Sequence, residues 1–527
     1  MPLHPILVAG RWRAANSTGS FRIDNPATGE TLPDEFPIST WSDCDEALTA
    51  ALSAAKALRT VSPEKIAQFL TRFAERIEAR KAELVDTANA ESGLPKAPRL
   101  GDVELPRTTG QLRQAAAAVL EGSWALPTID AKLDIRSVLA PIGPVLVFGP
   151  NNFPFAFNSV AGGDFAAAIA SGNPVIAKAN TSHPGTTRLL AEEAFAAVGE
   201  AGLPPATVQL IYRTSHADGE RFVSDHRTGA TGYTGSRGAG LKLKAAADAA
   251  GKPIYLELSS VNPVVMLPGA LAERGAKLVD EFTGSCLMGT GQFCTSPSLV
   301  VLIASPEAEQ FVAAVKAKLE AAPVAPLLSS AVAKSLASSV EILRGAGAEV
   351  LTGGAPVKTP GSRYANTLLR VTGDGFLAAP EKLQTEAFGN AALVVVVRDL
   401  AQAAEVIGHL EGNLTGCVYS DTQGRDDAAY ATLEPLLRER VGRLLNDKMP
   451  TGVAVSSAMN HGGPYPSTGH PGFTAVGIPA ALRRFGALHC YDNVRAARLP
   501  LALRNQNPNG KMWRLINGQW SQGDVAV

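Results

Sequence analysis

VLVFG at residues 145–149 ends at a proline, and three more short apolar runs follow it along the chain: PVIAKA (174–179), TVQLIY (207–212) and ATGYTG (230–235). Each run has the length of a buried strand, and stretches with the composition of helices separate the runs. Strands that alternate with helices in this way form a parallel sheet with helices on both faces. Ligands of such sheets bind beyond the carboxyl ends of the strands, so we expect a binding site there.

The same alternation continues on both sides of this stretch. Residues 40–125 carry apolar positions at helical spacing, which predicts packed surface helices, and residues 158–171 predict a further helix. Two more strands are expected within residues 253–267, and a second cycle of strands and helices runs from residue 299 to residue 421. The predicted fold class is therefore α/β, with two doubly wound parallel-sheet domains, joined near residues 258–270, and a small arm.

The composition of the 527 residues excludes several classes of protein. Apolar residues make up 46% of the chain, which allows large cores and excludes global disorder. The net charge of −1, with 18% charged residues, argues against nucleic-acid binding and against a polybasic membrane surface. No apolar run approaches the ~18 residues of a spanning helix, and the first residues do not have the pattern of a secretory signal.

Cysteine usage predicts a reduced, cytoplasmic chain without a metal site. The five cysteines are scattered, without zinc-like spacing: Cys44, Cys286, Cys294, Cys417 and Cys490. Cys294 stands apart, because Gly289 and Gly291 precede it and Pro297 follows it, which predicts a turn. A cysteine on a turn is open to reagents and its pKa is readily lowered. A cysteine in an apolar helix, such as Cys286, is an inert core residue, and spacing alone leaves both interpretations open for Cys294.

Two other polar features lie at the ends of expected strands. Glu257 is the one carboxylate in the apolar run PIYLEL (253–258). An unpaired buried carboxylate is costly, so we expect Glu257 either to form a structural salt bridge or to have a function. Asn151 and Asn152 directly follow the strand at residues 145–149, where their amides either satisfy the turn or donate to an oxyanion.

A glycine-rich turn, GSRGAG (235–240), lies between an expected strand and helix. Its glycines do not follow the dinucleotide pattern G-x-G-x-x-G, so the signal is weak by itself. A helix that begins there, with Ser236 as its cap, still favours a phosphate. The chain has no Walker loop, no HExxH and no G-x-S-x-G, which excludes the commonest NTPases, zincins and α/β-hydrolases.

Ten motifs, taken in order, resemble the aldehyde dehydrogenase superfamily over most of the chain. They are NPATGE (25–30), APIGPV (140–145), NNFPF (151–155), PVIAK (174–178), YTGSRGAG (233–240), LELSSVNPVV (256–265), GQFCT (291–295), EAFGN (386–390), NLTG (413–416) and GGPYPSTG (462–469). Two further segments, RTTGQLR (107–113) and LHCYDNVRAARLP (488–500), are more similar to the bacterial α-ketoglutarate semialdehyde (2,5-dioxovalerate) dehydrogenase branch.

The resemblance implies an NAD(P)-dependent oxidation of an aldehyde to a carboxylic acid. Cys294 stands at the position of the nucleophile, which forms a thiohemiacetal and then a thioester. Asn152, with the backbone N–H of Cys294, is implied to hold the oxyanion, and Glu257 to activate the water that hydrolyses the thioester. The residues implied to contact the cofactor are Lys178, Gly235, Ser236, Glu386 and Phe388.

Departures from the family pattern bear on the cofactor and the substrate entrance. The usual K-P-x-E reads Lys178-Ala179-Asn180-Thr181, so Thr181 replaces a glutamate that would repel a 2′-phosphate. Arg213, just past the strand at residues 207–212, is placed to supply a positive charge. We therefore predict NADP as the cofactor, with NAD as the alternative if Arg213 is only a solvated charge. The usual P-F-G-G-x-K loop reads HGGPYPSTG (461–469), which leaves the shape of the substrate entrance open.

The branch resemblance implies oxidation of α-ketoglutarate semialdehyde to α-ketoglutarate. Phe157, Phe293 and Thr295 are expected to line the substrate tunnel. Arg107 and Gln111 share one face of a helix and are expected to hold the substrate carboxylate, although a polar surface face is the alternative. The aromatic residues also fit a long-chain aliphatic or aromatic aldehyde, or another semialdehyde.

The resemblance also divides the chain into parts. Residues 1–123 and 142–260 are expected to bind NADP, residues 261–460 to carry the catalytic cysteine, residues 124–141 and 485–500 to form an oligomerisation arm, and residues 501–527 to be a C-terminal extension. Because family members are dimers or tetramers, we expect a homodimer or homotetramer built through the arm. A CoA-acylating enzyme is disfavoured because those relatives lack a base at the position of Glu257. A catalytically silent binding protein is disfavoured because Cys294 and Asn152 are present.

Overall fold

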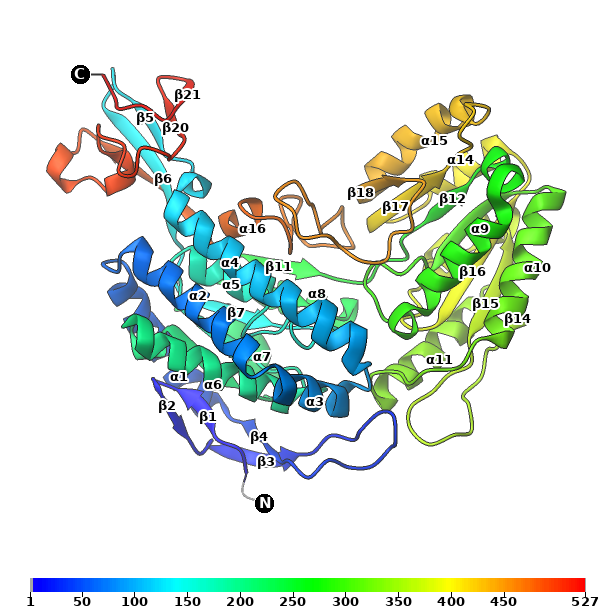
Figure 1. The fold of residues 1–527 in the computed structure, drawn as a ribbon, viewed down its shortest axis with the longest axis horizontal. Helices are drawn as coiled ribbons and strands as arrows, with labels where there is room; N and C mark the ends of the chain where they lie inside the picture. Colours follow the sequence, from blue (N-terminus) through cyan, green and yellow to red (C-terminus); the bar gives the residue numbers. More distant parts are fainter. Residues whose placement is uncertain (1–2, 527) are drawn as a thin grey trace.

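Two seven-stranded sheets form the centres of two lobes, and a smaller sheet projects from the first lobe as an arm (Figure 1). The structure is a computed structural model that describes residues 3–526. The segment between residues 447 and 479 crosses between the two lobes without regular secondary structure. This arrangement confirms the predicted fold class of two parallel-sheet α/β units with an arm.

The first sheet contains the strands that the apolar runs predicted. Five consecutive strands of it are parallel, and two N-terminal strands continue the sheet antiparallel at one side. In spatial order the strands are β11 (Ile254–Glu257), β10 (Ala230–Thr234), β7 (Val145–Phe148), β8 (Val175–Lys178), β9 (Val208–Ile211), β1 (Ile6–Val8) and β2 (Arg11–Arg13). Because β7, β8, β10 and β11 are parallel, the polar residues that follow them meet at one edge of the sheet.

Helices cover both faces of this sheet and bury their apolar sides against it. In α2, for example, Pro63 occupies the first turn, and the buried Phe69 and Phe73 pack against the Phe165 ring of α5, which lies next to the sheet, in tilted and edge-to-face contacts. The helices of this lobe are α1 (Trp41–Leu58), α2 (Pro63–Ala79), α3 (Lys81–Ser92), α4 (Leu105–Glu121), α5 (Gly163–Ala170), α6 (Pro184–Ala201), α7 (His216–Ser224) and α8 (Arg237–Ala249).

One expected helix begins later than its composition suggested. The prediction was a helix over residues 158–171, but α5 begins only at Gly163. The Asn158 side chain donates to Pro154 O and accepts from Val160 N, which holds the preceding residues in turns instead of a helix. The prediction was therefore wrong for the first five residues.

The second sheet repeats the parallel pattern, with one antiparallel edge strand. Its strands, in spatial order, are β14 (Glu349–Thr352), β15 (Thr367–Thr372), β16 (Ala391–Val397), β13 (Leu299–Ile303), β12 (Val264–Met266), β17 (Asn413–Tyr419) and β18 (Val441–Asn446). The helices are α9 (Pro268–Leu287), α10 (Pro306–Ala321), α11 (Ser330–Gly345), α12 (Gly373–Ala378), α13 (Pro380–Leu383), α14 (Leu400–Gly408) and α15 (Asp427–Arg440). Charged residues interrupt the apolar runs of β15 and β18, which were not predicted.

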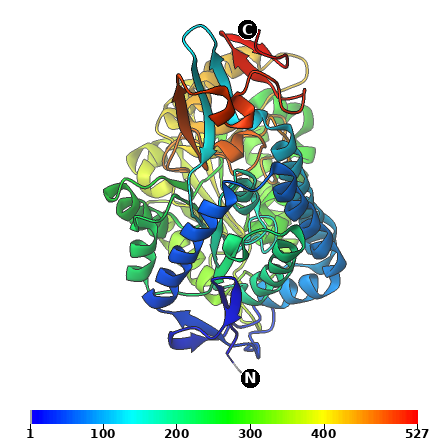
Figure 2. The same ribbon diagram turned by 90° about the vertical axis from the view of Figure 1, so that its left-hand side faces the viewer.

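The arm is a five-stranded sheet that includes the C-terminal residues (Figure 2). Its strands, in spatial order, are β19 (Gly486–Asp492), β6 (Ile135–Pro141), β5 (Thr128–Asp130), β20 (Arg514–Ile516) and β21 (Gln519–Ser521). A separate pair, β3 (Ser17–Phe21) and β4 (Phe36–Ser39), lies near the N-terminus, and the short α16 (Ala480–Arg483) precedes the arm.

The C-terminal extension is anchored by a buried cation and not by its tryptophans. Trp513 and Trp520 are 47% and 55% exposed, whereas Arg514 is fully buried. The guanidinium of Arg514 donates to the carbonyls of Arg504, Asn505 and Gly523, at 2.6, 3.0 and 2.8 Å. The extension therefore folds onto its own chain, beside β5.

Candidate active site

Cys294 lies on a tight turn that follows α9. Gly291 has φ +69°, and a Cβ at this position would lie 2.1 Å from Gly389 O, so only glycine fits there. The side-chain amide of Asn262 donates to Cys294 O at 2.8 Å and to Ser296 O at 2.9 Å. These contacts fix the backbone on both sides of the thiol.

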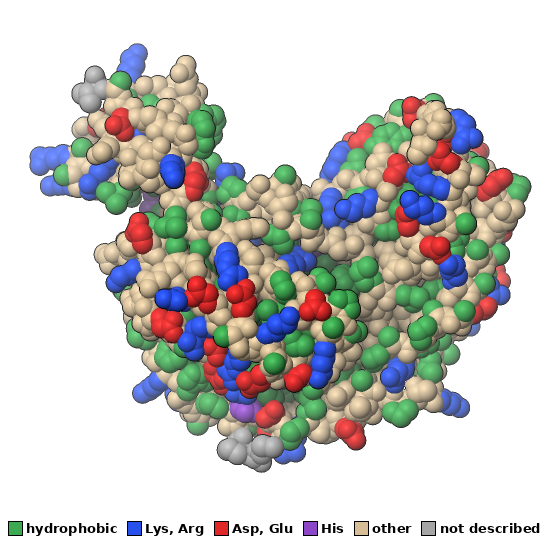
Figure 3. Space-filling model, in the orientation of Figure 1, with side chains coloured by type: hydrophobic (Ala, Val, Ile, Leu, Met, Phe, Trp, Pro, Cys, Tyr) green, Lys and Arg blue, Asp and Glu red, His purple; other side chains and the backbone are tan. Residues whose placement is uncertain are grey.

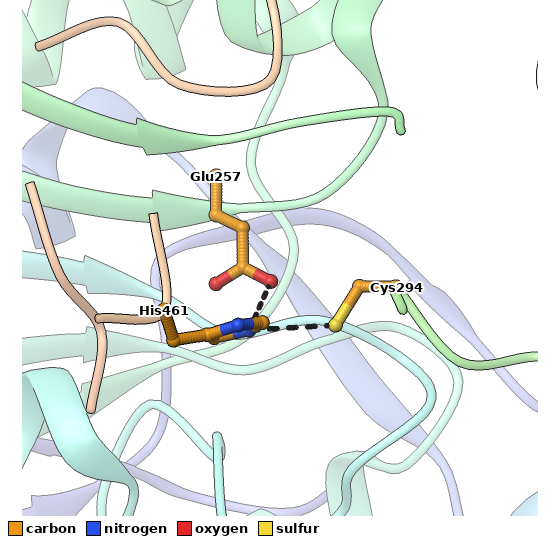
Figure 4. A group of neighbouring side chains, drawn as sticks. All are labelled: Glu257, Cys294 and His461. Carbon is orange, nitrogen blue, oxygen red and sulfur yellow. Dashed lines mark hydrogen bonds and ion pairs between the residues drawn. The ribbon is translucent and has the colours of Figure 1, made fainter. Parts of the chain in front are cut away.

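Three side chains converge at this turn: Cys294, Glu257 and His461 (Figure 4). Nε2 of His461 lies 3.4 Å from Sγ of Cys294 and 2.8 Å from Oε1 of Glu257. The side chains of Glu257 and His461 are each only 1% exposed. Glu257 is therefore paired with His461, as the salt-bridge interpretation expects, and it also lies near a thiol, as the functional interpretation expects. The imidazole of His461 lies between the carboxylate and the thiol.

His461 was not identified from the sequence, and a loop far along the chain positions it. Its backbone N–H donates to Thr474 Oγ1 at 2.9 Å, and its carbonyl accepts from Ala475 N at 2.9 Å. The same loop pairs with the end of β11, where Leu258 N donates to Ser467 O at 2.8 Å. The only signal in the sequence was a histidine that opens the altered loop HGGPYPSTG (461–469).

Burial raises the pKa of the Cys294 thiol well above its usual value, and the neighbouring Glu257 raises it further, while the Arg107 guanidinium acts in the opposite direction. The expectation of a lowered pKa was therefore wrong. The turn is present and Cys294 is partly exposed, but the thiol faces a carboxylate. A thiol in this environment stays protonated near neutral pH, so its use as a nucleophile requires a base within reach.

Asn152 follows β7 and is held from two sides. Its side-chain amide donates to Gln292 O at 3.0 Å, next to the cysteine turn, and its backbone carbonyl accepts from Arg99 Nη2 at 3.0 Å. Since a primary amide has two N–H donors, the second is available to an oxygen near Cys294. The buried Glu104 accepts from Phe155 N and Ala156 N, which fixes the segment that carries Asn152.

Two adjoining cavities run along the carboxyl edge of the first sheet. The larger, of about 770 Å³, is lined by Lys178, Thr181, Arg213, Gly235 and Ser236. The smaller, of about 240 Å³, is lined by Asn152, Gly235, Ser236, Glu257, Cys294, Glu386 and Phe388. Because Gly235 and Ser236 line both, the cavities form one trough that ends at Cys294. The structure thus brings together all the residues that were predicted to contact the cofactor.

The charged residues of the trough are held in an environment that shifts their pKa values. Burial, together with Arg213, lowers the pKa of Lys178 to about 8. Burial raises the pKa of Glu386 to about 7, against hydrogen bonds from Ser259 and Ser260 that lower it. Ser236 occupies the N-cap position of α8 but its hydroxyl makes no capping bond, which leaves it free to face the trough.

On the other side of Cys294, an aromatic cluster faces a buried guanidinium. The ring of Phe153 contacts those of Phe157 and Phe293 edge to face, with centroids 5.1 and 5.3 Å apart. The Arg107 guanidinium lies over Phe153 and Phe157, 5.7 and 5.2 Å from the centroids. Its buried Nε and Nη2 have no hydrogen-bond partner among the described residues. Arg107 is therefore a charged side chain that lies against the largely apolar wall formed by these aromatic rings.

Two residues expected at the substrate tunnel are engaged elsewhere. Gln111 is buried and donates to Ala156 O at 3.3 Å, so it supports the tunnel wall. The hydroxyl of Thr295 accepts from Gly452 N at 3.2 Å, which ties the cysteine turn to the crossing segment. The structure therefore leaves Arg107 as the charged side chain of this set that is free for a ligand.

A family model and two curated relatives match this chain over most of its length. A family model described as the aldehyde dehydrogenase family matches residues 12–455. The chain is 37% identical to alpha-ketoglutaric semialdehyde dehydrogenase 2 of Azospirillum brasilense, over 96% of this chain and 98% of that protein. It is 34% identical to an alpha-ketoglutaric semialdehyde dehydrogenase of Acinetobacter baylyi, over 92% and 93% of the two chains.

Solved structures show the same fold. The NAD+ complex of the aldehyde dehydrogenase from Bacillus cereus superposes with a TM-score of 0.79 at 21% identity, over 93% of this chain and 96% of that one. The family match covers most of the chain, and both relatives align with it nearly end to end. The protein therefore belongs to the aldehyde dehydrogenase family.

Proposed function

We propose that this protein oxidises α-ketoglutarate semialdehyde to α-ketoglutarate, with NADP as the hydride acceptor and Cys294 as the nucleophile. The observation that carries the substrate assignment is Arg107, a buried guanidinium without a partner beside the aromatic wall. The substrate has an aldehyde at one end and a carboxylate at the other. The carboxylate would pair with Arg107 while the aldehyde carbon meets Sγ of Cys294. The names of the two relatives support the same substrate.

The first step needs a thiolate, and His461 is positioned to produce it. Nε2 of His461, 3.4 Å from Sγ, accepts the thiol proton, and the Glu257 carboxylate, 2.8 Å from the same nitrogen, stabilises the resulting imidazolium. The thiolate then attacks the aldehyde carbon. The free N–H of the Asn152 amide and the backbone N–H of Cys294 hold the oxyanion of the thiohemiacetal.

NADP held along Lys178, Arg213 and Glu386 would supply the hydride acceptor needed for oxidation of the thiohemiacetal to a thioester. Glu257 is then the base that removes a proton from water, and the water attacks the thioester carbonyl. The carboxylic acid leaves, and Cys294 takes its proton back. The carboxylate is buried, and its Oε2 has no hydrogen-bond partner within residues 3–526, which suits it to this task.

NADP fits the larger cavity on grounds of charge. Lys178 and Arg213 both line it, and burial together with the charge of Arg213 lowers the pKa of Lys178, so a negative group between the two cations would be favourable. A 2′-phosphate would supply that charge, and Thr181 offers a hydroxyl where a glutamate would repel it. The NAD+ complex of the B. cereus structure supports a nicotinamide dinucleotide in general.

We also propose the division of the chain given above, with the first sheet binding NADP and the second presenting Cys294. The arm would join two or four copies, because β19 is an open edge strand whose Leu488 is 70% exposed. We also propose a cytoplasmic location, which the five free cysteines support. None of the helices within residues 3–526 has both the length and the apolar character needed to cross a membrane.

The test is the rate of NADP and NAD reduction with a panel of aldehydes. The panel contains α-ketoglutarate semialdehyde, succinate semialdehyde, glutaraldehyde, a long-chain aliphatic aldehyde and benzaldehyde. We expect the highest kcat/KM for α-ketoglutarate semialdehyde with NADP. A higher kcat/KM for the long-chain or aromatic aldehyde would mean that the aromatic cluster, and not Arg107, determines which substrate binds. A higher kcat/KM with NAD would contradict the proposal that the cavity binds a 2′-phosphate.

A further inference from the structure

The cluster of Cys294, His461 and Glu257 has the composition of a zinc site, although no spacing in the sequence indicated one. A thiolate, an imidazole and a carboxylate are the three side-chain ligands that zinc uses most. Their ligand atoms all lie within 4.8 Å of one another. Figure 4 shows the three side chains, from three separate segments, pointing at one small volume. We propose that this cluster binds Zn²⁺ reversibly and that the bound ion blocks the enzyme.

The distances are close to those of a zinc site. Zinc lies about 2.3 Å from sulfur and about 2.0–2.2 Å from nitrogen or oxygen, so tetrahedral ligand atoms lie about 3.3–3.6 Å apart. The separation of Sγ of Cys294 from Nε2 of His461 is 3.4 Å, which already meets this requirement. Oε1 of Glu257 lies 2.8 Å from Nε2, and a shift of about 1 Å of this flexible carboxylate completes the geometry.

The Glu257 carboxylate is a second observation that favours a cation at this place. It is 1% exposed, and although Oε1 lies 2.8 Å from Nε2 of His461, Oε2 has no hydrogen-bond partner among the described residues. A buried carboxylate oxygen without a partner is unfavourable, and a metal ion would satisfy it. When Cys294 and Glu257 are both ionised, the cluster carries two negative charges, which one Zn²⁺ neutralises.

The ion has a route to the cluster and an open fourth position. The cavity of about 240 Å³ is lined by both Cys294 and Glu257, and it continues into the larger one through Gly235 and Ser236. Three protein ligands and one open position, filled by water, are typical of accessible zinc sites. Binding would displace the thiol proton to solvent and occupy the lone pair of Nε2. Both the nucleophile and its base would then be unavailable.

The test measures metal binding directly, without substrate or nucleotide, so its outcome is independent of the substrate proposal. The enzyme is titrated with Cd²⁺ in metal-free buffer, and the thiolate-to-cadmium charge-transfer band in the ultraviolet is followed. Zn²⁺ is then added to displace the cadmium. We expect one Cd²⁺ per chain and protection of Cys294 from iodoacetamide, read by peptide mass spectrometry.

Variants assign the ligands. Cys294→Ser should abolish the band, whereas His461→Gln and Glu257→Gln should each weaken binding by about tenfold or more, since even removal of a group that supports a zinc ligand costs 10–100-fold. Cys490→Ser is the matched control, because Cys490 is an exposed thiol on β19, and it should change nothing. Thermal unfolding of each variant verifies that it is folded. A band that survives Cys294→Ser, or an affinity unchanged in both His461→Gln and Glu257→Gln, would overturn the proposal.

Discussion

Nε2 of His461 lies 3.4 Å from Sγ of Cys294, although the two residues are 167 positions apart in the chain. The contact joins the turn after α9 to the loop that crosses between the lobes. Figure 3 shows that the face above this crossing is hollowed between the arm and the second lobe. The candidate site is therefore assembled from both lobes, and the proton transfer that we propose from the thiol would depend on the position of the crossing loop.

Replacement of His461 tests whether it is the base for Cys294. We expect His461→Gln to lower kcat by about 10²–10⁴-fold, the usual contribution of a positioned acid–base group, with a smaller change in KM. The rate of Cys294 alkylation by iodoacetamide should fall in parallel and shift to higher pH. His470→Gln, in the same loop, is the control and should react like the wild type. An unchanged alkylation profile in His461→Gln would remove His461 from the first step.

Arg107 is predicted to select a substrate with a carboxylate. Arg107→Leu should lower kcat/KM for α-ketoglutarate semialdehyde by about 100-fold, because charge-assisted hydrogen bonds to the carboxylate are lost. The value for benzaldehyde should stay level or rise. Arg113→Leu on the same helix is the control, since Arg113 pairs with Glu78 at the surface. Equal losses on both substrates would mean that Arg107 acts on the fold and not on the carboxylate.

Arg213 is predicted to recognise the 2′-phosphate. Arg213→Ala should raise KM for NADP by about 10–100-fold and leave KM for NAD nearly unchanged, since a charge-assisted contact is lost only with NADP. Thr181→Glu should add repulsion and reverse the preference. Lys244→Ala, at the surface of α8, provides the comparison. The prediction fails if both variants keep the wild-type ratio of the two KM values.

The pH dependence of kcat/KM for NADP should follow the titration of Lys178. Burial and Arg213 lower its pKa to about 8, so the free enzyme loses this cation as the pH rises through 8. Since kcat/KM reports groups of the free enzyme, kcat/KM for NADP should decline above pH 8. Lys178→Arg keeps its charge over this range and should flatten the decline. A decline of equal size in Lys178→Arg would assign the titration to another group.

Arg514 is predicted to stabilise the C-terminal extension without affecting catalysis. Arg514→Met removes the donor of three carbonyls, those of Arg504, Asn505 and Gly523, at a cost of about 1–3 kcal/mol for each one that water does not satisfy. The melting temperature should fall and proteolysis beyond residue 500 should accelerate, while kcat stays constant. Lys511→Met, at an exposed position nearby, should leave both measurements unchanged. A loss of kcat in Arg514→Met would connect the extension to the active site.

The fold was predictable because its strands are short apolar runs bounded by turn residues. Strands β7 to β11 begin and end within a residue or two of the runs in the sequence. The start of α5 was not predictable, because the side chain of Asn158 competes with helix formation. The role of Arg514 in the tail was also hidden, since a lone arginine normally lies at the surface.

The candidate site was predictable where it follows strand ends and glycine turns. Glu257 ends β11, Asn152 follows β7, and Cys294 sits on a turn that requires Gly291. The contribution of His461 was not predictable, because its contacts with Cys294 and Glu257 are long-range and no periodicity in the sequence encodes them. The raised pKa of Cys294 was missed for the same reason: burial under the crossing loop is a tertiary property.

The most direct test of the account is to trap the acyl-enzyme. Glu257→Gln, which lacks the proposed base for thioester hydrolysis, is mixed with α-ketoglutarate semialdehyde and NADP, and the digested protein is examined by mass spectrometry. We predict one α-ketoglutaryl group on the peptide that carries Cys294, formed only when NADP is present. The absence of this adduct, or its appearance on another cysteine, would contradict the proposed chemistry.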